Sequence, residues 1–255
     1  MIGNGIKQRF DELYAKGEPA IGLLANSYDP ALVEMIGRAG WDYIVIDGEH
    51  APLGPMEMLP LVRAAEANGL VPLCRIQENS RALIQKVADI GVEGVFIPHV
   101  ESAAEMEYAV RAAKFPRDGG FRSYCPGMHA SGYSARHWAA YEEHTRENFQ
   151  VIPILESAAA WDNLDEILAV DGVEYACSGP GDLAADLGID PRGSELTPYW
   201  EKFVELCGKH DVKIITPPFP GMQPGQFHAY LPGMDLMFIS DMFENLAGST
   251  RELIK

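Results

Sequence analysis

The stretch D-Y-I-V-I-D-G-E-H, residues 42–50, decides the fold that we expect for this chain. Residues 43–46 form a short apolar run rich in β-branched side chains, which is typical of a strand buried on both faces. The run stops at the tetrapeptide 47–50, which places three ionisable residues at the carboxyl end of the strand. A polar turn with a solvated carboxylate pair would explain this tetrapeptide on its own. The same design, an apolar strand ending in a polar or charged residue, recurs along the chain and favours a functional interpretation.

Apolar runs and helical patterns alternate along most of the sequence. Besides 43–46, strands are predicted at 20–25, 71–75, 94–98, 151–155, 174–178, 212–216 and 236–240. Helices are predicted at 5–16, 30–38, 55–68, 80–89, 102–114, 161–170, 195–209, 223–230 and 243–254. Such alternation predicts a parallel sheet covered by helices, and eight strands in 255 residues fit a (β/α)8 barrel whose first helix caps one end. We therefore expect an α/β protein in which residues 1–255 form a single TIM barrel domain.

A long loop insert at about 115–150 interrupts this rhythm. It carries several aromatic residues and three histidines, and it is too long and too polar for an ordinary connection. A loop of this kind is commonly a lid, a substrate-specificity insert or a subunit contact. We favour a mixture of the last two.

The composition limits the classes of partner. The chain has 20 Lys and Arg residues against 37 Asp and Glu residues, a net charge of −17, which repels nucleic acids and anionic membrane surfaces. A small anionic substrate remains compatible, because a bound cation and one arginine can reverse the potential locally. The four cysteines are far apart, and there is neither an apolar signal region nor a window approaching the ~20 apolar residues of a membrane span. These features predict a reduced, cytoplasmic setting.

Active sites of such barrels are built at the carboxyl ends of the strands, so the residues that end each strand are the candidates. They are Asp47, Glu49, His50, Arg75, His99, Glu156, Asp182, Thr216 and Asp241. Glu156 and Asp182 follow adjacent strands and could reach one point near the barrel axis, where hard oxygen ligands favour Mg2+ or Mn2+. Two protein ligands would leave positions for water or a chelating substrate. The alternative is that both carboxylates only begin or cap the helices that follow.

Two further observations restrict the chemistry. The tripeptide Gly179-Pro180-Gly181 exposes backbone N–H groups that suit a carboxylate or phosphate, although it is also an ordinary turn. None of the eight lysines falls at the carboxyl end of a predicted strand, which argues against a Schiff base and leaves carbanion chemistry to a metal. The sequence contains no nucleophile elbow, Walker loop or dinucleotide fingerprint.

Five motifs, taken together, resemble the HpcH/HpaI aldolases. They are D-G-E-H at 47–50, the strand that ends at Arg75, V-A-D-I-G around Asp89, I-L-E ending at Glu156 and G-P-G-D-L around Asp182. Their order and spacing are similar to that family over roughly residues 18–190, and the last part of the chain is less similar. Members of the family are metal-dependent class II pyruvate aldolases, including those for 2-keto-3-deoxy sugar acids and hydroxy-oxo-diacids.

The resemblance implies how the metal and the substrate are held. Glu156 and Asp182 would bind the divalent metal, and the carboxylate and carbonyl oxygens of the keto acid would chelate it. Backbone N–H groups around Gly181 and Asp182 would also hold that carboxylate. Arg75 would stabilise the enolate oxygen.

The resemblance also implies an acid–base residue. His50, oriented by Asp89, would take and return the proton of the aldol hydroxyl. For Asp89 the alternative is a helix-end carboxylate bonded to nearby backbone. The chain departs from the family pattern at 154–156, where Q-I-E is replaced by I-L-E, and at 122–123, where R-G is replaced by R-S. These departures leave the identity of the substrate open.

We therefore expect a carbon–carbon lyase that joins or separates pyruvate, or a related 2-keto acid, and an aldehyde. Its cofactor would be Mg2+ or Mn2+, with Co2+, Zn2+ or Ni2+ as alternatives. Two rivals stay open: an oxaloacetate decarboxylase or condensing enzyme on the same fold, and a catalytically silent barrel that binds a keto acid. The resemblance further implies a homo-oligomer, usually a hexamer, and the apolar final helix would suit exchange between subunits.

Overall fold

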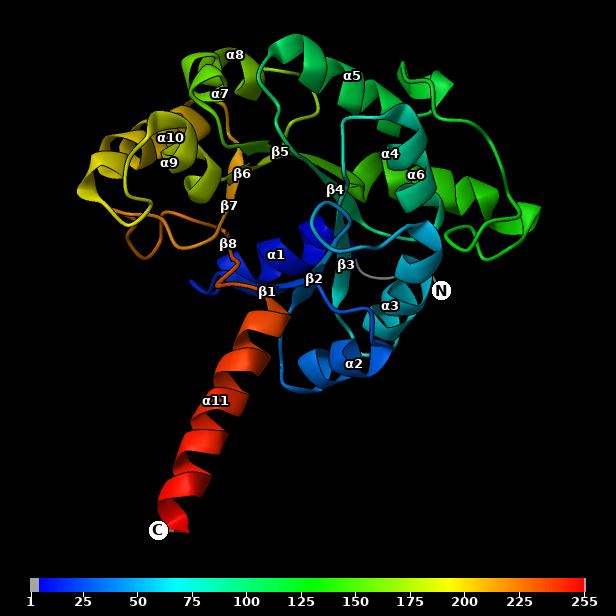
Figure 1. Ribbon diagram of the computed structural model, residues 1–255. Coiled ribbons are helices and arrows are strands. Elements are labelled where there is room, and N and C mark those ends of the chain that lie inside the picture. Colours follow the sequence, from blue (N-terminus) through cyan, green and yellow to red (C-terminus); the bar gives the residue numbers. More distant parts are fainter. Residues whose placement is uncertain (1–4, 255) are drawn as a thin grey trace.

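Parallel strands close into a barrel at the centre of the molecule (Figure 1). The computed structural model describes residues 5–254. The strands follow one another around the barrel in sequence order: β1 (Ala20–Ala25), β2 (Tyr43–Asp47), β3 (Val71–Arg75), β4 (Gly94–Ile97), β5 (Gln150–Leu155), β6 (Tyr175–Ser178), β7 (Lys213–Thr216) and β8 (Ala229–Tyr230). β8 closes the barrel by pairing in parallel with β1. The TIM barrel predicted from the alternating pattern is therefore confirmed.

Most helices pack on the outside of the barrel. The α-helices of the described residues are α1 (Ile6–Tyr14), α2 (Pro30–Arg38), α3 (Pro55–Ala67), α4 (Arg81–Asp89), α5 (Ala103–Ala113), α6 (Trp138–Asn148), α7 (Ala158–Asp162), α8 (Leu164–Leu168), α9 (Pro180–Leu187), α10 (Thr197–Lys209) and α11 (Asp235–Leu253). Local sequence accounts for their starts: Asp29 accepts a hydrogen bond from the Ala31 N–H before α2 (2.9 Å), and Ser102 forms a capping box with Glu105 before α5. None of the helices in the described part of the chain is both long enough and apolar enough to cross a membrane.

The predicted first helix, α1, closes the amino-terminal end of the barrel. Its Phe10 is buried against Tyr43 and Tyr175, the first residues of β2 and β6, with ring centroids 5.1 and 6.0 Å away. These rings belong to the apolar cluster inside the barrel, and a second, larger cluster lies between the strands and the outer helices. Apolar side chains therefore fill the interior of the barrel at its amino-terminal end.

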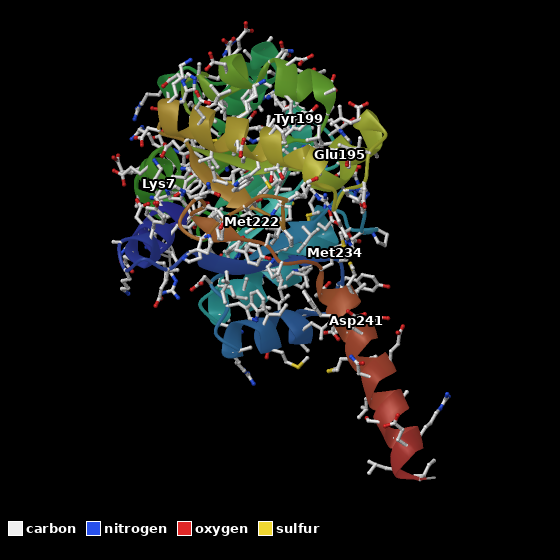
Figure 2. The ribbon with its side chains drawn as sticks, turned by 90° about the vertical axis from the view of Figure 1, so that its left-hand side faces the viewer. Lys7, Glu195, Tyr199, Met222, Met234 and Asp241 are labelled. Atoms are coloured by element: carbon white, nitrogen blue, oxygen red, sulfur yellow. The ribbon has the colours of Figure 1, made fainter. Side chains whose placement is uncertain are left out.

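The carboxyl-terminal part of the chain differs from the prediction. Residues 236–240, predicted as the eighth strand, lie inside α11, and the true β8 is a two-residue strand within a predicted helix. An apolar run of five residues suits either a buried strand or the stripe of a helix, and the continuation of the pattern at Phe243 is helical. Asp241, predicted at a strand end, therefore lies on a helix that projects from the barrel (Figure 2).

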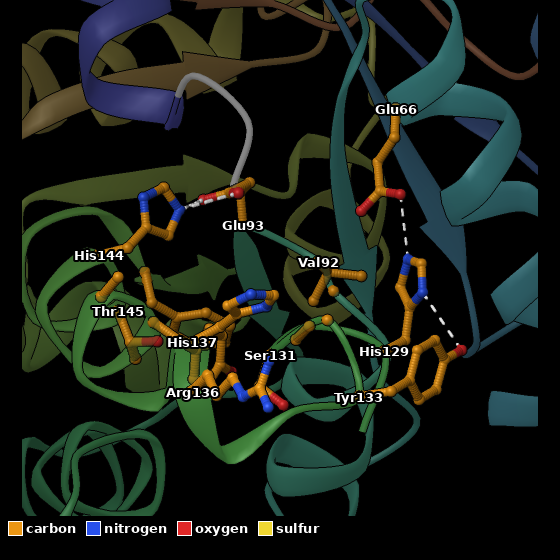
Figure 3. Close-up of a pocket in the computed structure, with 16 residues that line it drawn as sticks. Glu66, Val92, Glu93, His129, Ser131, Tyr133, Arg136, His137, His144 and Thr145 are labelled. Atoms are coloured by element: carbon orange, nitrogen blue, oxygen red, sulfur yellow. Dashed lines mark hydrogen bonds and ion pairs between the residues drawn. The ribbon is translucent and has the colours of Figure 1, made fainter. Parts of the chain in front are cut away.

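Both ends of the insert lie at the amino-terminal end of the barrel, because it runs from the end of α5 to the start of β5. It contains α6, which the sequence pattern did not predict. His129 bonds to Glu66 near the end of α3 (3.0 Å), and His144 bonds to Glu93 just before β4 (2.8 Å) (Figure 3). These contacts hold the part of the insert that carries its histidines at the amino-terminal end. A role in specificity or in a subunit contact stays a prediction.

Candidate active site

Asp47 is the buried centre of the carboxyl-terminal end of the barrel. It ends β2 and lies beside Arg75, which ends β3, in the parallel register. Its Oδ1 accepts a hydrogen bond from Arg75 Nε (2.9 Å) and from the backbone N–H groups of Glu49 (3.1 Å) and His50 (3.4 Å). Its Oδ2 accepts a hydrogen bond from Asn26 Nδ2 (2.6 Å). Four donors thus surround a carboxylate with no exposed surface, as a buried charge requires.

Arg75 is held from two sides by carboxylates. Besides Asp47, it contacts Glu49 through Nη1 (3.1 Å), while Nη2 is buried and has no hydrogen-bond partner among the described residues. Burial lowers the pKa of Arg75, but the hydrogen bond and charge of Asp47, with the charges of Glu49 and Glu156, outweigh it and raise the pKa above its ordinary value. The guanidinium is therefore a fixed positive charge with one unpartnered donor nitrogen.

His99 links two of the carboxylates. Its Nε2 lies 3.4 Å from Glu49 Oε1, and its Nδ1 lies 3.3 Å from Glu156 Oε1. The backbone N–H of His99 also donates to Glu156 Oε1 (2.7 Å). His99 has a φ of 52°, in the left-handed region that is uncommon for residues other than glycine. In this backbone conformation, both the main-chain N–H and the imidazole of His99 lie close to Oε1 of Glu156.

Glu156 is a buried acid beside a second acid. Burial raises its pKa, as do the charges of Glu49 and Asp182, although the N–H and charge of His99 act in the opposite direction. Asp182 lies in the first turn of α9, close enough for its charge to act on Glu156. Gly179 precedes that helix, and a Cβ there would lie 2.4 Å from Glu156 Cβ, so only glycine fits. The close approach of the two segments keeps both carboxylates in one area.

His50 and Asp89 are not brought together within one chain. His50 is largely exposed at the site, with Nε2 3.9 Å from Glu49 Oε2. Asp89 ends α4, the helix that returns from the end of β3 to the start of β4, so it lies at the amino-terminal end of the barrel. There it accepts a hydrogen bond from Arg122 (2.9 Å). Any contact between Asp89 and His50 would therefore require a second copy of the chain.

A cavity of about 530 Å3 lies away from these catalytic candidates (Figure 3). The insert, the end of α3 and the segment before β4 form its walls, with Glu66, Glu93, His129, His137 and His144 among the lining residues. Because this cavity lies at the amino-terminal end, it does not include the residues that end the strands. We therefore place the candidate active site around Asp47 and Glu156, at the opposite end of the barrel.

The strand-end rule found most of the polar groups at this end but missed two of their partners. Asn26 directly follows β1, so the rule should have included it, but it was not predicted as a candidate. Asp235 was also missed; it binds the Asn26 backbone N–H (2.9 Å) and the Ser27 hydroxyl (2.6 Å). Of the remaining candidates, Thr216 is buried and shares a hydrogen bond with the Ser178 hydroxyl (2.8 Å).

Comparisons with known proteins agree with this arrangement. The model of the HpcH/HpaI aldolase/citrate lyase family matches residues 20–216, which span β1 to β7 and include every polar residue of the site except Asp235. The chain belongs to this family. A 2-keto-3-deoxy-L-rhamnonate aldolase from Escherichia coli O17:K52:H18 is 35% identical over 182 residues, which cover 70% of this chain and 66% of the relative, slightly less than two thirds of its length.

Solved structures of similar proteins have the same fold. An HpcH/HpaI aldolase from Desulfitobacterium hafniense DCB-2 superimposes with a TM-score of 0.85 at 27% identity, covering 95% of this chain and 96% of that one. The citrate synthase SbnG gives a TM-score of 0.85 at 24% identity, covering 98% and 99%. A more distant citrate lyase β subunit from M. tuberculosis, in complex with oxaloacetate and magnesium, gives 0.53 at 14% identity, covering 85% and 91%.

The citrate lyase β subunit binds magnesium, and we asked whether residues of this chain could hold such an ion. Within residues 5–254, no group of three or more His, Cys, Asp or Glu side chains is arranged to hold a metal. The chain does supply one pair of acids, Glu156 and Asp182, and the charge of Asp182 contributes to raising the pKa of Glu156. A cation between them would offset that repulsion. Two protein oxygens would suit Mg2+, which usually keeps several positions for water or substrate.

Removing the charge of Asp47 should destabilise the protein strongly. In Asp47→Asn the buried Arg75 loses its ionic partner, and breaking such a pair costs about 3–5 kcal/mol. Urea unfolding at pH 7 would measure the loss. The control is Arg38→Ala, which breaks the exposed pair with Glu34 and should change the free energy of unfolding little. Equal effects of the two variants would contradict the central role of Asp47.

Removing the charge of Glu156 should stabilise the metal-free protein. Because its pKa is raised in the fold, ionised Glu156 destabilises the native state fully above that raised pKa, and the penalty disappears as the pH falls to the ordinary value of 4.5 or below. Glu156→Gln should therefore unfold at a higher temperature than the wild type at pH 7, by roughly 2–4 °C for each kcal/mol recovered. The difference should shrink toward pH 4.5.

Thermal unfolding with and without Mg2+ would measure both consequences. Excess Mg2+ should raise the unfolding temperature of the wild type and leave that of the variant unchanged. Glu166→Gln, an exposed change on α8, is the control and should behave like the wild type. A variant that is less stable than the wild type at pH 7, yet still responds to Mg2+, would count against this role of Glu156.

Proposed function

We propose that this protein is a divalent-metal-dependent aldolase that forms or cleaves a C–C bond between pyruvate, or a related 2-keto acid, and an aldehyde. The observation that carries the proposal is the grouping of Arg75, with its unpartnered nitrogen, and the acidic pair Glu156 and Asp182 at one end of the barrel. Together they suit a substrate on which negative charge develops on an oxygen. The match to the aldolase/citrate lyase family supports the same class of reaction.

The acidic pair would hold the metal ion, which, when bound, draws electrons from the keto group and so makes the adjacent methyl protons removable. The first turn of α9 would bind the carboxylate of the keto acid. Pro180 has no N–H, and the backbone N–H groups of Gly181 and Asp182 lie in the first turn, where helices lack internal acceptors. A Cβ on Gly181 would meet nothing within 4 Å, so space beside it is open.

Arg75 and His50 would carry the remaining steps. The buried guanidinium is fixed by Asp47 and Glu49, so it can stabilise an enolate oxygen without reorganising. His50 is exposed beside Glu49, where its imidazole is free to take the proton of the aldol hydroxyl in cleavage and to return it in synthesis. If Asp89 orients His50, it does so from a neighbouring subunit.

The position of the lysines supports a metal rather than a Schiff base. Lys213 begins β7 at the opposite end of the barrel, and Lys7, Lys114, Lys202 and Lys209 contact acids or carbonyl groups on the outside of the barrel. No lysine in the described part of the chain ends a strand. Carbanion formation would therefore depend on the metal, Arg75 and the residues around them.

We expect the protein to exchange the methyl protons of pyruvate with deuterium oxide in the presence of Mg2+ or Mn2+. Exchange needs no aldehyde, so NMR of pyruvate measures enolisation by itself. A chelator, Glu156→Gln or Asp182→Asn should each slow exchange by at least about a hundredfold, the scale of a lost electrostatic stabiliser. The control Glu174→Gln lies at the amino-terminal end and should leave exchange unchanged.

Deuterium exchange that continues in the presence of the chelator, together with borohydride trapping of pyruvate on a lysine, would contradict the metal mechanism. Product analysis separates the related reactions. Oxaloacetate alone yields pyruvate and CO2 in a decarboxylase, whereas an aldolase gives a longer keto acid from pyruvate and an aldehyde. Absence of exchange in a protein that still binds pyruvate would favour the silent barrel.

The same proposal includes a homo-oligomer formed by exchange of α11. This helix projects from the barrel (Figures 1 and 2). Its large apolar side chains are about half exposed: Leu236, Met237, Phe238, Met242, Phe243 and Leu246. Ile21 on β1 is 38% exposed on the barrel wall. Each chain thus has an apolar helix and an incompletely covered wall, and two copies could cover both. A single helix in water would be only marginally stable, so a partner is favoured.

The mass in solution should therefore exceed the 28.0 kDa of one chain. Light scattering after size-exclusion chromatography would measure it, with a hexamer as the expected state by family resemblance. Phe243→Glu with Leu246→Glu should reduce the mass, because charges would enter the apolar contact. Asn245→Glu adds charge to the same helix and serves as the control. A monomeric wild type, or a double variant of unchanged mass, would rule out the exchange.

A further inference from the structure

Asn26 follows β1 in the row of strand ends that contains Asp47 and Arg75. β1 and β2 pair in parallel with Ala25 beside Ile46, so the next residues, Asn26 and Asp47, are neighbours. β2 and β3 continue the row, because Asp47 is paired with Arg75. Three polar side chains from three adjacent strands are therefore in register at the carboxyl-terminal end of the barrel.

The two carboxylate oxygens of Asp47 have separate partners. Oδ1 accepts hydrogen bonds from Arg75 Nε (2.9 Å) and from two backbone N–H groups of the turn that follows β2. Oδ2 accepts one from Asn26 Nδ2 (2.6 Å), and no second donor to Oδ2 is found among the described residues. Asp47 has no exposed surface, so Oδ2 depends on the Asn26 amide for its hydrogen bond.

This division of partners leaves one nitrogen of Arg75 available. Nε and Nη2 form one edge of a guanidinium group, and such an edge commonly binds both oxygens of a carboxylate at once. Here Nε binds Asp47, whereas Nη2 is buried without a hydrogen-bond partner in the described part of the chain. Asp47 does not occupy Nη2, because its second oxygen is bonded to Asn26 instead.

The main chain of Asn26 is itself held in place. Its N–H donates to Asp235 Oδ1 (2.9 Å), and Asp235 is the buried first residue of α11. The hydroxyl of the next residue, Ser27, donates to the other oxygen of Asp235 (2.6 Å). Within residues 5–254, no hydrogen bond joins Ser27 to Asp47 or Arg75. Asn26 and Ser27 thus share the anchor on α11, but only Asn26 continues to the catalytic arginine.

We propose that Asn26 is a positioning residue for Arg75: its amide holds Asp47 Oδ2 and so keeps Arg75 Nη2 available to the substrate. This inference rests on the proposed function, in which the guanidinium stabilises the enolate oxygen. Without the amide, Asp47 would rotate and satisfy Oδ2 with Nη2. The buried ion pair would remain, but the nitrogen that the enolate needs would be occupied.

Removing the amide should lower the rate of enolisation rather than the affinity for pyruvate. In Asn26→Ala, kcat for the Mg2+-dependent exchange of pyruvate methyl protons should fall by about tenfold to a hundredfold, the range typical of a lost positioning contact. KM for pyruvate should change by less than about threefold, because the charge on the enolate oxygen develops only after binding.

Ser27→Ala is the matched control. It removes a buried hydroxyl from the neighbouring residue, together with the hydrogen bond to Asp235, but no contact with Asp47. Its kcat for exchange should equal that of the wild type. A crystal structure of Asn26→Ala provides a second measurement that does not depend on activity: Asp47 Oδ2 should lie within hydrogen-bond distance of Arg75 Nη2.

Asn26→Asp separates positioning from a loss of structure. An ionised carboxylate cannot donate a hydrogen bond to Asp47, whereas a protonated carboxyl group can. The charge of Asp47 would raise the pKa of the introduced carboxyl group, so this group would take up a proton more readily than one in water. The kcat of Asn26→Asp relative to the wild type should therefore rise as the pH is lowered from about 8 to about 6. The same ratio for Asn26→Ala should not change with pH.

Several results would overturn this inference and leave the proposed function standing. They are unchanged exchange in Asn26→Ala, an equal loss of kcat in Ser27→Ala, a ratio for Asn26→Asp that does not depend on pH, or a structure of Asn26→Ala in which Nη2 still lacks a partner. Lack of Mg2+-dependent exchange in the wild type would overturn the proposed function, and the inference with it.

Discussion

The buried pair of Asp47 and Arg75 is the constraint on which the site depends. Removing two charges from water costs several kcal/mol for each ion, and a buried pair repays this only when additional hydrogen bonds satisfy both partners. Asp47 meets that condition with donors from Asn26 and from the two residues after β2, as well as Arg75. These contacts fix the turn that carries Glu49 and His50. One interaction thus joins β1, β2 and β3 and positions three polar side chains.

The two ends of the barrel differ in character, and α11 is connected to the carboxyl-terminal end, where the polar residues of the candidate site lie. Aromatic rings fill the amino-terminal end, where α1 and the insert also lie. The first residue of α11 is Asp235, which is buried and accepts hydrogen bonds from the backbone N–H of Asn26 and the hydroxyl of Ser27. Asn26 in turn binds Asp47. Three successive contacts therefore connect α11 with Arg75, so the exchange of α11 that we propose would be physically linked to the geometry of the site.

The sequence could predict what depends on local periodicity and on the direction of the strands. Parallel strands place their last residues at one end of a barrel, so the positions of Glu156 and Arg75 followed from the pattern alone. The run 236–240 could not be assigned in this way, because five apolar residues fit a strand or a helix equally well, and tertiary context decides. Arg122 as the partner of Asp89 was equally inaccessible, because the insert that carries it has no repeating pattern.

The charge balance of the site explains why the proposed chemistry needs a cation. Asp47, Glu49, Glu156 and Asp182 contribute four negative charges and Arg75 one positive charge, so the group has a net charge of −3 with its histidines neutral. A keto acid would bring a further negative charge into this field, and the raised pKa of Glu156 already reflects burial and the repulsion among the acids. A divalent ion would reverse the sign where the keto acid must bind. Metal binding should therefore precede substrate binding, because the negative charge of the site repels the carboxylate of the keto acid until the cation is bound.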